Sequence, residues 1–556
     1  MTRIFTRRDF LKFGSAAAAG LLAACAPSAQ PAPTAAPKAT EAPKPAATGA
    51  PAPAATQAPK PAATQAPAAP TKAAAGPKQG GTFSLGTTAG VQEFNPFNPA
   101  MGNTPFIRSI YNSLLHYDAQ LNLQPELAEK YEVSADGKTV TLKLREGVKY
   151  HSGRDFTSAD VKSSVDFAST NERSIMRALF KTIKQVETPD KYSVALKFDT
   201  LNPGMYDLLD GLYMIDKETI EDRSKTGIGT GPFQITTFVP NDRVEMVANK
   251  GYWEKGKPYL DKYIIRQVPD SSALSVNLES SALDCIHGAA YVDAARLKQT
   301  GDKFVVRAGP PGSVIYDVGM NVKVEPFSNK KVRQAIAWAI DRERFCKTSL
   351  QGFAVPTCLM WPSSSWAYFK ELEGKIGFDL DKAKALLKEA GYEKGFDCEL
   401  QTSTKTRAGY TDLATIMQAD LKKIGINAKL LDLEPTVYTN RNQNLQMVFM
   451  THAYGRANRD PGTMLTGAKA WYLEKDGGWT HIDSPDYERL MKDLNSTLDR
   501  TKRQETCHKI QEFVLDECFT VPVADSPTMT IYQKYVQGYT SNPDDSPFVG
   551  NVWLDK

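Results

Sequence analysis

"LQPELAEKYEVSADGKTVTLKLREGVKYHSGRDFTSADVKSS", residues 123–164, is the stretch of the chain that says most about the fold. Within it, "TVTLKL" (139–144) alternates apolar and polar side chains, which is the pattern of a half-buried strand. Further along, Thr157 and Asp160 have the spacing of a capping box, which predicts that a helix begins there. A strand and a helix so close together in the chain are typical of an α/β protein.

The chain on either side of this stretch continues the mixture of strands and helices. "YSVALKF" (192–198) repeats the alternating strand pattern. "KKVRQAIAWAIDRERF" (330–345) places its apolar residues on one face of a predicted helix. "LATIMQADLKKIGINAKLL" (413–431) predicts a helix that runs directly into a strand.

One further helix has both of its ends marked in the sequence. In "DLDKAKALLKEAGY" (379–392), Asp379 or Asp381 predicts the start and Gly391 the end. Together with the other elements, residues 79–556 comprise 478 residues, which is too many for one hydrophobic core. We therefore expect two or three α/β lobes with mixed sheets.

The N-terminus resembles two bacterial export signals in succession. "TRRDFLK" (6–12) contains a twin arginine and is followed by a short segment of small apolar residues, 13–24, which is too short to be a membrane-spanning helix. The segment ends in Leu-Ala-Ala before Cys25, which is similar to the lipobox of a lipoprotein. The resemblance implies twin-arginine export, removal of residues 1–24 and lipid attachment to Cys25. The alternative is a chance amphipathic N-terminus.

Residues 25–78 are predicted to be a disordered tether that begins with the lipidated cysteine. Residues 26–78 contain thirteen prolines but no aromatic residue and no Ile, Leu, Val or Met, so they cannot bury enough apolar surface to fold. An extended segment of this length reaches roughly 160 Å. Residues 1–78 also carry a net charge of +7, whereas the whole chain carries +4. The basic character therefore lies in the leader and the tether, and gives no reason to expect nucleic-acid binding.

The reactive residues of the chain form no recognisable catalytic or metal-binding motif. "GIGTGPF" (227–233) lacks the spacing of a phosphate-binding loop and predicts a tight turn that re-enters a sheet. We find no nucleophile motif, and the six histidines are scattered, so we expect neither an enzyme nor a bound cofactor or metal. Six cysteines remain after position 25, without CxxC or Cys/His metal spacing, and are interpreted as small buried apolar residues: 285, 346, 358, 398, 507 and 518.

Seven stretches, from about Gly80 onward, occur in the order typical of one protein family. They are "GGTFSLGTT" (80–88), residues 123–164, "GTGPFQI" (229–235), "NKGYWEKGKPYLDKYIIRQVPD" (249–270), "MNVKVEPFSNKKVRQAIAWAIDRERF" (320–345), "LDKAKALLKEAGYEKGF" (380–396) and "DYERLMKDLNSTLDRTKRQETCHKIQEFVLDECFTVPV" (486–523). By these stretches the chain resembles the family 5 bacterial extracellular solute-binding proteins, which serve peptide, nickel, opine and some oligosaccharide ABC importers.

The resemblance implies a two-lobed fold of the periplasmic-binding-protein type II kind, with hinged lobes and mixed sheets. Lobe I would combine residues 79–312 with 523–556 and include an inserted subdomain at about 115–228, and lobe II would be 313–522. The two crossings would lie near 312–317 and 521–524. The chain would then be a monomer that encloses a small-molecule solute by hinge closure and presents it to the permease subunits of an ABC importer. The lipid on Cys25 would hold it at the outer face of the cytoplasmic membrane.

Two stretches are candidates for the walls of the cleft. "EFNPFNP" (93–99) follows the opening strand, and Phe94, Asn95 and Phe97 would supply an apolar wall and one amide. The alternative is a surface turn fixed by proline with packed phenylalanines. "MWPSSSWAYF" (360–369) offers two indoles, Trp361 and Trp366, for stacking on a sugar or an apolar group, and the alternative is that both fill the core of lobe II.

The third candidate is "HAYGRANRDP" (452–461), with Arg456 and Arg459 in one loop. In peptide-binding members of the family, an aromatic residue and an Asp that accepts the peptide's α-amino group precede an Asp-Pro pair. When the match is anchored on Asp460, Tyr454 takes the aromatic position and Ala457 takes that of the amine-binding Asp.

That substitution changes the kind of group the loop would bind. A buried ammonium group beside arginine is unfavourable by several kcal/mol, whereas an arginine paired with a carboxylate contributes roughly 1.5–3 kcal/mol. Lys405 and Arg407, in the "STKTRAGY" loop (403–410), would add positive charge. The alternative is that the loop arginines point to solvent or bind Asp460. We expect an anionic or hydroxyl-rich solute, with an oligopeptide receptor, or a signalling or chaperone protein on the same fold, as alternatives.

Overall fold

The computed structural model describes residues 76–97, 104–118, 120–171, 174, 177–222, 226–455 and 457–556. These residues belong to one compact unit, Ala75–Lys556. The predicted signal, the lipidation site at Cys25 and nearly all of the predicted tether lie outside the described residues, as does Arg456. Within the described part of the chain, no helix is both long and apolar enough to span a membrane.

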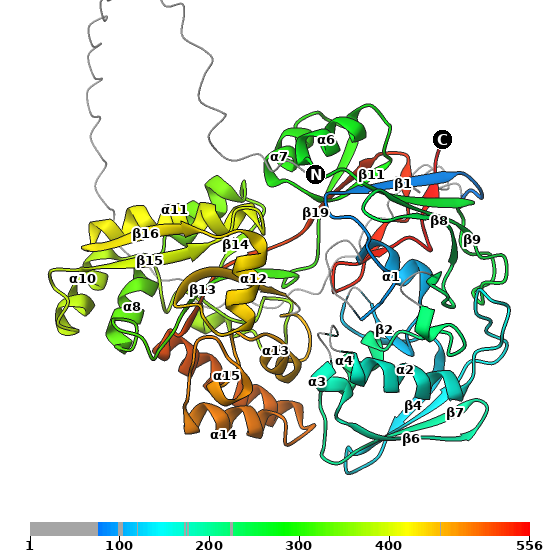
Figure 1. The fold of residues 1–556 in the computed structure, drawn as a ribbon, viewed down its shortest axis with the longest axis horizontal. Coiled ribbons are helices and arrows are strands. Elements are labelled where there is room, and N and C mark those ends of the chain that lie inside the picture. Colours follow the sequence, from blue (N-terminus) through cyan, green and yellow to red (C-terminus); the bar gives the residue numbers. More distant parts are fainter. Residues whose placement is uncertain are drawn as a thin grey trace, which may run out of the picture. The chain divides into compact units, whose positions relative to one another are not determined.

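The first lobe is built on a seven-stranded mixed sheet (Figure 1). β1 lies in its middle, parallel to both β10 and β11, whereas β19 from the end of the chain is inserted antiparallel between β11 and β12. In sheet order the strands are β12 (Phe304–Ala308), β19 (Met529–Gln533), β11 (Cys285–Ala289), β1 (Thr82–Thr87), β10 (Lys262–Gln267), β9 (Arg243–Ala248) and β8 (Phe233–Val239).

Each face of this sheet has a hydrophobic core of its own. The alternation along β11 shows the division, because Cys285 belongs to one buried cluster and the next residue, Ile286, to the other. Ile286 packs in the cluster that includes Leu274 of α6 and Leu297 of α7, and Cys285 lies in the cluster that includes Ile110 of α1. These helices are α1 (Thr104–Ile110), α6 (Ser271–Glu279) and α7 (Tyr291–Lys298).

The predicted strand of residues 123–164 belongs to a four-stranded antiparallel sheet, and the predicted helix is α2 beside it. The alternation in "TVTLKL" is confirmed, since Val140, Leu142 and Leu144 are all buried. The capping box is confirmed as well, because the carboxylate of Asp160 accepts a hydrogen bond from the backbone N–H of Thr157 at 2.9 Å. The sheet order is β4 (Ala128–Val133), β5 (Thr139–Leu144), β7 (Ser193–Phe198) and β6 (Ile183–Asp190), with β2 (Leu115–Tyr117), β3 (Leu123–Pro125), α2 (Ser158–Thr170), α3 (Arg177–Phe180), α4 (Met205–Gly211) and the 3₁₀ turn η2 (Ile220–Asp222) around it.

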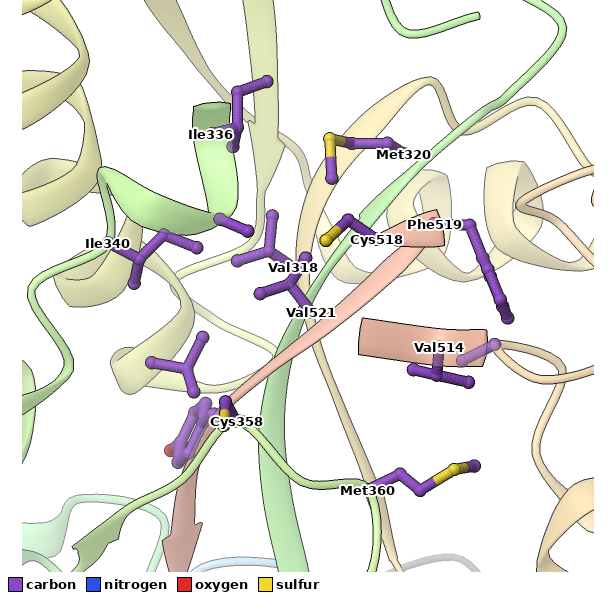
Figure 2. Close-up of a cluster of buried hydrophobic side chains, with 14 of the residues drawn as sticks. Val318, Met320, Ile336, Ile340, Cys358, Met360, Val514, Cys518, Phe519 and Val521 are labelled. Atoms are coloured by element: carbon purple, nitrogen blue, oxygen red, sulfur yellow. The ribbon is translucent and has the colours of Figure 1, made fainter. Parts of the chain in front are cut away.

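The second lobe is built on a six-stranded mixed sheet whose core includes side chains from β13, β18 and α8 (Figure 2). In order the strands are β14 (Val355–Pro356), β18 (Thr520–Ser526), β13 (Val314–Met320), β17 (Phe449–Gly455), β15 (Phe396–Thr402) and β16 (Ile426–Asp432). The helices are α8 (Lys330–Trp338), α9 (Arg342–Arg344), the π-helical turn η3 (Phe345–Ser349), η4 (Lys370–Leu372), α10 (Leu380–Glu389), α11 (Ala408–Lys423), α12 (Pro435–Gln443), α13 (Pro461–Gly467), η5 (Glu474–Asp476), α14 (Pro485–Leu494) and α15 (Arg500–Glu517).

Two predicted helices of this lobe have different outcomes. The helix over 379–392 is confirmed, because Asp379 accepts hydrogen bonds from the first backbone N–H groups of α10 and Gly391 ends the helix with a φ of +83°. In 330–345, the predicted apolar helical face is confirmed in α8, where Val332, Ala335 and Ile336 are buried, but the helix does not continue through the whole stretch. α8 ends at Trp338, and α9 begins after Asp341, whose side chain accepts from the N–H of Arg344 and so caps a new start.

The chain passes between the two sheets at two points. The first passage is 309–313, between β12 and β13, and the second is 527–528, between β18 and β19. β18 therefore stays in the second sheet as far as Ser526, a few residues beyond the return to lobe I at 523 that the family resemblance implies. After β19, the chain ends in the short strands β20 (Val536–Gln537), β21 (Thr540–Ser541), β22 (Pro547–Phe548) and β23 (Trp553–Leu554).

Candidate functional site

Two cavities lie where the loop after β17 faces α4 and the loop before β22. The inner cavity has a volume of about 70 Å³, and its lining includes Asp210 of the first lobe and Thr463 of the second. The outer cavity has a volume of about 560 Å³, and its lining includes Tyr206 of the first lobe and Trp366 of the second. Arg459 lines both cavities, so its side chain lies between them.

Arg459 crosses from the second lobe to carboxylates of the first. It stands in the short loop between β17 and α13, where Asp460 caps the helix by accepting from the N–H of Gly462 at 2.9 Å. Its Nη1 lies 2.7 Å from Oδ2 of Asp210, and its Nη2 lies 3.6 Å from Oδ2 of Asp544. Burial opposes the charge, yet the surrounding carboxylates raise the pKa of Arg459 above its usual value, so the guanidinium stays charged.

Asp210 is shared by two buried guanidiniums. Besides Arg459, it accepts a hydrogen bond from Nη2 of Arg108 at 2.7 Å and one from the backbone N–H of Tyr117 at 3.1 Å. Burial acts to raise the pKa of Asp210, but Arg459 and Arg108 together hold it below the usual value. The carboxylate is therefore ionised, and its negative charge is already matched inside the protein.

Asp207, one helical turn before Asp210, makes a second contact between the lobes. It accepts a hydrogen bond from the backbone N–H of Asp460 at 3.0 Å and another from the hydroxyl of Tyr117 at 3.0 Å. Burial raises the pKa of Asp207 to about 6, against the opposing effect of Arg459. This carboxyl group therefore titrates close to neutral pH.

The carboxylate of Asp460 is bound entirely within the second lobe. Arg503 of α15 binds both of its carboxylate oxygens, with each N–O distance at 2.7 Å. The same carboxylate also caps α13, so it holds the loop that carries Arg459 against α15. In this arrangement Asp460 offers no unpaired oxygen to a ligand amine.

The outer cavity combines aromatic walls with positive charge. Tyr131 and Tyr206 of the first lobe meet edge to face, with ring centroids 6.2 Å apart. From the second lobe, Trp366 has the guanidinium of Arg500 at 3.9 Å and that of Arg503 at 5.1 Å from its ring centroid. Such a cavity suits a ligand with a planar or hydroxyl-bearing body and a negative group.

Several aromatic residues predicted for the cleft walls lie in the cores. Phe94 is fully buried against Phe106 and Phe238. Trp361 is fully buried in the second-lobe core, and the hydroxyl of Tyr454 donates to the carbonyl of Met360 at 2.8 Å. None of the three predicted residues lines either cavity, because each packs in the hydrophobic core of its lobe.

The remaining residues of these two predicted walls have mixed positions. Phe97 lines the inner cavity, and Trp366 lines the outer one. Asn95 uses its side-chain oxygen to accept a hydrogen bond from the backbone N–H of Phe97 at 3.1 Å, so it stabilises its own turn.

The two basic residues of the 403–410 loop line neither cavity. Lys405 is exposed and pairs with Glu434 at 2.9 Å. Arg407 precedes α11, and its guanidinium carbon lies 5.8 Å from the ring centroid of Tyr316. Burial opposes the charge of Arg407, but Tyr316 and Tyr410 raise its pKa. Lys405 and Arg407 therefore add no positive charge to the lining of either cavity.

The acidic partners of Arg459, and several residues that line the outer cavity, were not predicted from the sequence. These residues come from four distant segments: Tyr117, the pair Asp207 and Asp210, Arg500, and Asp544. No spacing in the sequence connects these segments, and only the fold brings them together. A partial signal was available in α4, where two acidic residues in an otherwise apolar helix are both buried.

The described residues contain no group of three or more His, Cys, Asp or Glu side chains placed to hold a metal ion. The six cysteines are all unpaired; Cys398 is half-buried and the others are buried, which confirms their interpretation as small apolar residues. The fold and the site thus define a class: a protein of two α/β lobes, joined by two chain passages, with charged and aromatic groups facing each other in the cleft.

The comparisons with known proteins give the family within this class. The model of the bacterial extracellular solute-binding proteins, family 5 (middle part), matches residues 122–471. The chain belongs to this family. The dipeptide-binding protein of Escherichia coli K12 is 28% identical over 501 residues, covering 83% of this chain and 92% of that protein. The glutathione-binding protein GsiB of Salmonella paratyphi A is 32% identical over 462 residues, covering 79% and 87%.

Solved structures agree on the fold. The periplasmic binding protein AgaA from A. tumefaciens R10, in complex with agropinic acid, superimposes with a TM-score of 0.75 at 24% identity, covering 86% of this chain and 99% of that one. This similarity shows the type II-like periplasmic-binding-protein fold. Proteins of family 5 are extracytoplasmic receptors, not enzymes, and deliver solutes to the permeases of ABC importers.

Proposed function

We propose that this chain captures a small solute in the cleft between its lobes and delivers it to the permease subunits of an ABC importer. Membership of family 5 and the two-lobed fold support this role. The twin-arginine and lipobox motifs support export and attachment to the outer face of the cytoplasmic membrane through Cys25. The Pro/Ala-rich segment up to residue 78 is then a tether that lets a monomeric receptor reach outward and return to the membrane.

We further propose that the solute is anionic or hydroxyl-rich and not a peptide with a free amine. The single observation that carries this proposal is that no unpaired carboxylate faces the cleft from the loop after β17. Ala457 is fully buried, and both oxygens of Asp460 are bound by Arg503. A ligand ammonium group at this loop would meet Arg459 without a partner of its own, which is unfavourable.

An oligopeptide ligand is the second candidate, and a different observation favours it. Asp207, Asp210 and Asp544 of the first lobe form an acidic group whose charge Arg459 and Arg108 partly neutralise in this closed form. If the lobes separate, this group becomes available to a ligand amine. The dipeptide-binding relative of Escherichia coli also supports this candidate.

A thermal-shift screen of the unliganded full-length chain distinguishes the two candidates. The panel contains di- and tripeptides, the same peptides with acetylated N-termini, carboxylated small solutes and neutral oligosaccharides. We expect stabilisation by carboxylated or hydroxyl-rich compounds, and equal or better binding once the peptide amine is blocked. Stabilisation by free peptides alone would refute the ligand class and leave the receptor role intact.

The loop arginines are proposed to take part in this recognition. Arg459 lines both cavities, and Arg456 remains a proposal from the sequence. We expect Arg456→Ala to weaken binding of a carboxylated solute found in the screen, as measured by titration calorimetry. If Arg456 points only into solvent, its replacement will leave the affinity unchanged.

A further inference from the structure

The two cavities of the cleft differ in what they can hold. A cavity needs about 10–15 Å³ of volume open to water centres to hold one water molecule, and pockets for small ligands measure roughly 300–1,000 Å³. The inner cavity, at about 70 Å³, has room for little more than water, whereas the outer cavity, at about 560 Å³, has room for a solute. In this closed form, the outer cavity is therefore the place where a solute fits.

Among the described residues that line the outer cavity, one arginine forms no ion pair with a carboxylate. Among its three arginines, Arg459 pairs with Asp210 and Arg503 pairs with Asp460. Arg500 forms no ion pair with any described residue, and its guanidinium carbon lies 3.9 Å from the ring centroid of Trp366.

The acidic residue nearest to Arg500 in the chain is occupied elsewhere. Asp499 caps α15 and accepts hydrogen bonds from the N–H groups of Thr501 and Lys502 at 3.0 and 3.1 Å. Arg500 is exposed at this wall, and partial burial together with the charge of Arg503 lowers its pKa. The carboxylate of a ligand in the cavity would pair with its guanidinium.

The opposite wall of the cavity comes from the other lobe and is aromatic. Tyr131 and Tyr206 meet edge to face there, and Tyr131 is 36% exposed, so part of its ring faces open space. Aromatic side chains present apolar faces to planar rings and bind them in stacked or edge-on arrangements. A ligand that used both walls would touch both lobes at once and would favour the closed form.

We propose that the outer cavity is a binding site for a solute that carries a carboxylate on a ring-bearing body. Arg500 binds the carboxylate, Trp366 positions the guanidinium of Arg500, and Tyr131 with Tyr206 hold the ring. The inference rests on the proposed solute-receptor function and narrows its ligand class. It also adds Arg500, Tyr131 and Tyr206 to the residues that determine specificity.

Two probes that differ only in charge test the assignment of Arg500. N-acetylphenylalanine has a ring, a carboxylate and no free amine, and N-acetylphenylalaninamide replaces the carboxylate with a neutral amide. Titration calorimetry of the full-length chain should show the acid binding roughly tenfold more tightly than the amide, or better, as expected for a charge-assisted hydrogen bond. In Arg500→Gln this preference should vanish.

The matched control removes a charge from the same helix outside the cavity. Lys502→Gln on α15 changes the net charge by the same amount, and Lys502 does not line the outer cavity. We expect Lys502→Gln to keep the preference for the acid. Tyr206→Leu should weaken the binding of both probes by a similar factor, because the ring is common to both.

Several results would overturn the proposal. These are the absence of binding of the acid at millimolar concentration, equal binding of acid and amide by the unmodified chain, or an unchanged preference in Arg500→Gln. Unchanged circular dichroism and thermal midpoints of the variants confirm that they are folded. If other anionic solutes stabilise the protein in the thermal-shift screen while Arg500→Gln changes nothing, only this site is refuted and the receptor function stands.

Discussion

Arg459 of the second lobe forms ion pairs with two carboxylates of the first lobe. Arg459 is 7% exposed, and its guanidinium lies between Asp210 and Asp544 of the opposite lobe. A buried ion pair of this kind costs desolvation to form, and removing one partner leaves an uncompensated charge. In a hinged protein, a carboxylate that loses its arginine partner can be hydrated again, because opening of the cleft exposes it to water.

Arg459→Gln should therefore open the unliganded protein and not unfold it. Without the guanidinium, Asp210 keeps Arg108, whereas Asp544 loses the cation that reaches it from the second lobe. Small-angle X-ray scattering should show a larger radius of gyration than that of the unmodified chain. The control is Arg489→Gln, which removes an exposed arginine paired only with Asp486 one turn away. An unchanged radius of gyration would contradict the prediction.

A second prediction concerns His287, which is 8% exposed on β11 with Nδ1 3.1 Å from the hydroxyl of Thr530. Burial lowers the pKa of His287 to about 4, from an ordinary value of 6.5. Between these values the unfolded chain binds the proton and the folded chain does not, so stability falls as the pH drops from about 6.5 to 4. The loss amounts to about 3 kcal/mol at most.

His287→Asn should reduce this loss. The thermal midpoint of the unmodified protein should drop more between pH 7 and pH 4.5 than that of the variant. Comparing the two proteins isolates His287 from the buried carboxyl groups, such as Asp525, whose raised pKa acts in the opposite direction. Equal drops in both proteins would show that His287 is accessible to protons in the folded state.

At the scale of the element, local sequence patterns predicted local structure well. The cap at Asp379, the stop at Gly391 and the alternation in "TVTLKL" each depend on residues within one or two turns, and all three are confirmed. The break of the helix within 330–345 has the same local origin. The side chain of Asp341 caps the start of a new helix, α9, so the first helix does not continue. The periodic pattern of apolar residues does not indicate such a cap.

The candidate site was harder to predict because it depends on side-chain direction and on distant segments. Tyr454 and Trp361 had the composition of cleft residues, but both point into the second-lobe core. Arg459 was predicted from its loop, whereas its partner Asp210 lies on α4, more than two hundred residues earlier in the chain. A pair separated by that distance becomes visible only once the lobes are assembled.

The "GTGPF" turn gives a prediction at the element scale. A Cβ at Gly229 would lie 2.1 Å from the carbonyl oxygen of Ile110, so the glycine is needed for close approach of two backbones. His151 reinforces the turn, because its N–H donates to the carbonyl of Gly229 at 2.9 Å. Gly229→Ala should destabilise the first lobe by at least about 2 kcal/mol, as an overpacked core site does.

The measurement for this turn is the thermal midpoint, with Gly467→Ala as the control. A Cβ at Gly467, the last residue of α13, would meet nothing within 4 Å. The control should leave the midpoint nearly unchanged, and Gly229→Ala should lower it by several degrees. Equal midpoints would mean that α1 moves away from the turn at little cost.

At the scale of the whole molecule, Asp207 should make closure depend on pH. In the closed form it faces Arg459, Asp460 and Tyr117, and burial raises its pKa to about 6 from an ordinary value of 3.8. An open cleft exposes the carboxyl to water and returns its pKa towards the ordinary value. The closed form then binds more protons between these values, so closure is favoured at low pH and loses this contribution as the pH rises through about 6.

Small-angle X-ray scattering of the unliganded protein at pH 5 and pH 7.5 measures this effect. The radius of gyration should be smaller at pH 5, and Asp207→Asn should remove most of the difference by keeping the side chain neutral at both values. The sign is informative, since a salt bridge to Asp207 as the dominant interaction would predict opening at pH 5.

The position of β19 has a consequence for how the protein is made. This strand, Met529–Gln533, fills the gap between β11 and β12 in the sheet of the first lobe, although it is synthesised after the entire second lobe. During synthesis, β1 to β12 therefore leave the ribosome long before the last strand of their sheet is made. The sheet of the second lobe, in contrast, has all its strands once Ser526 has left the ribosome. Translation thus finishes the lobes in the reverse of their order in the chain. A transcript cut short before Met529 would leave two strand edges open to other chains, with aggregation as the expected outcome.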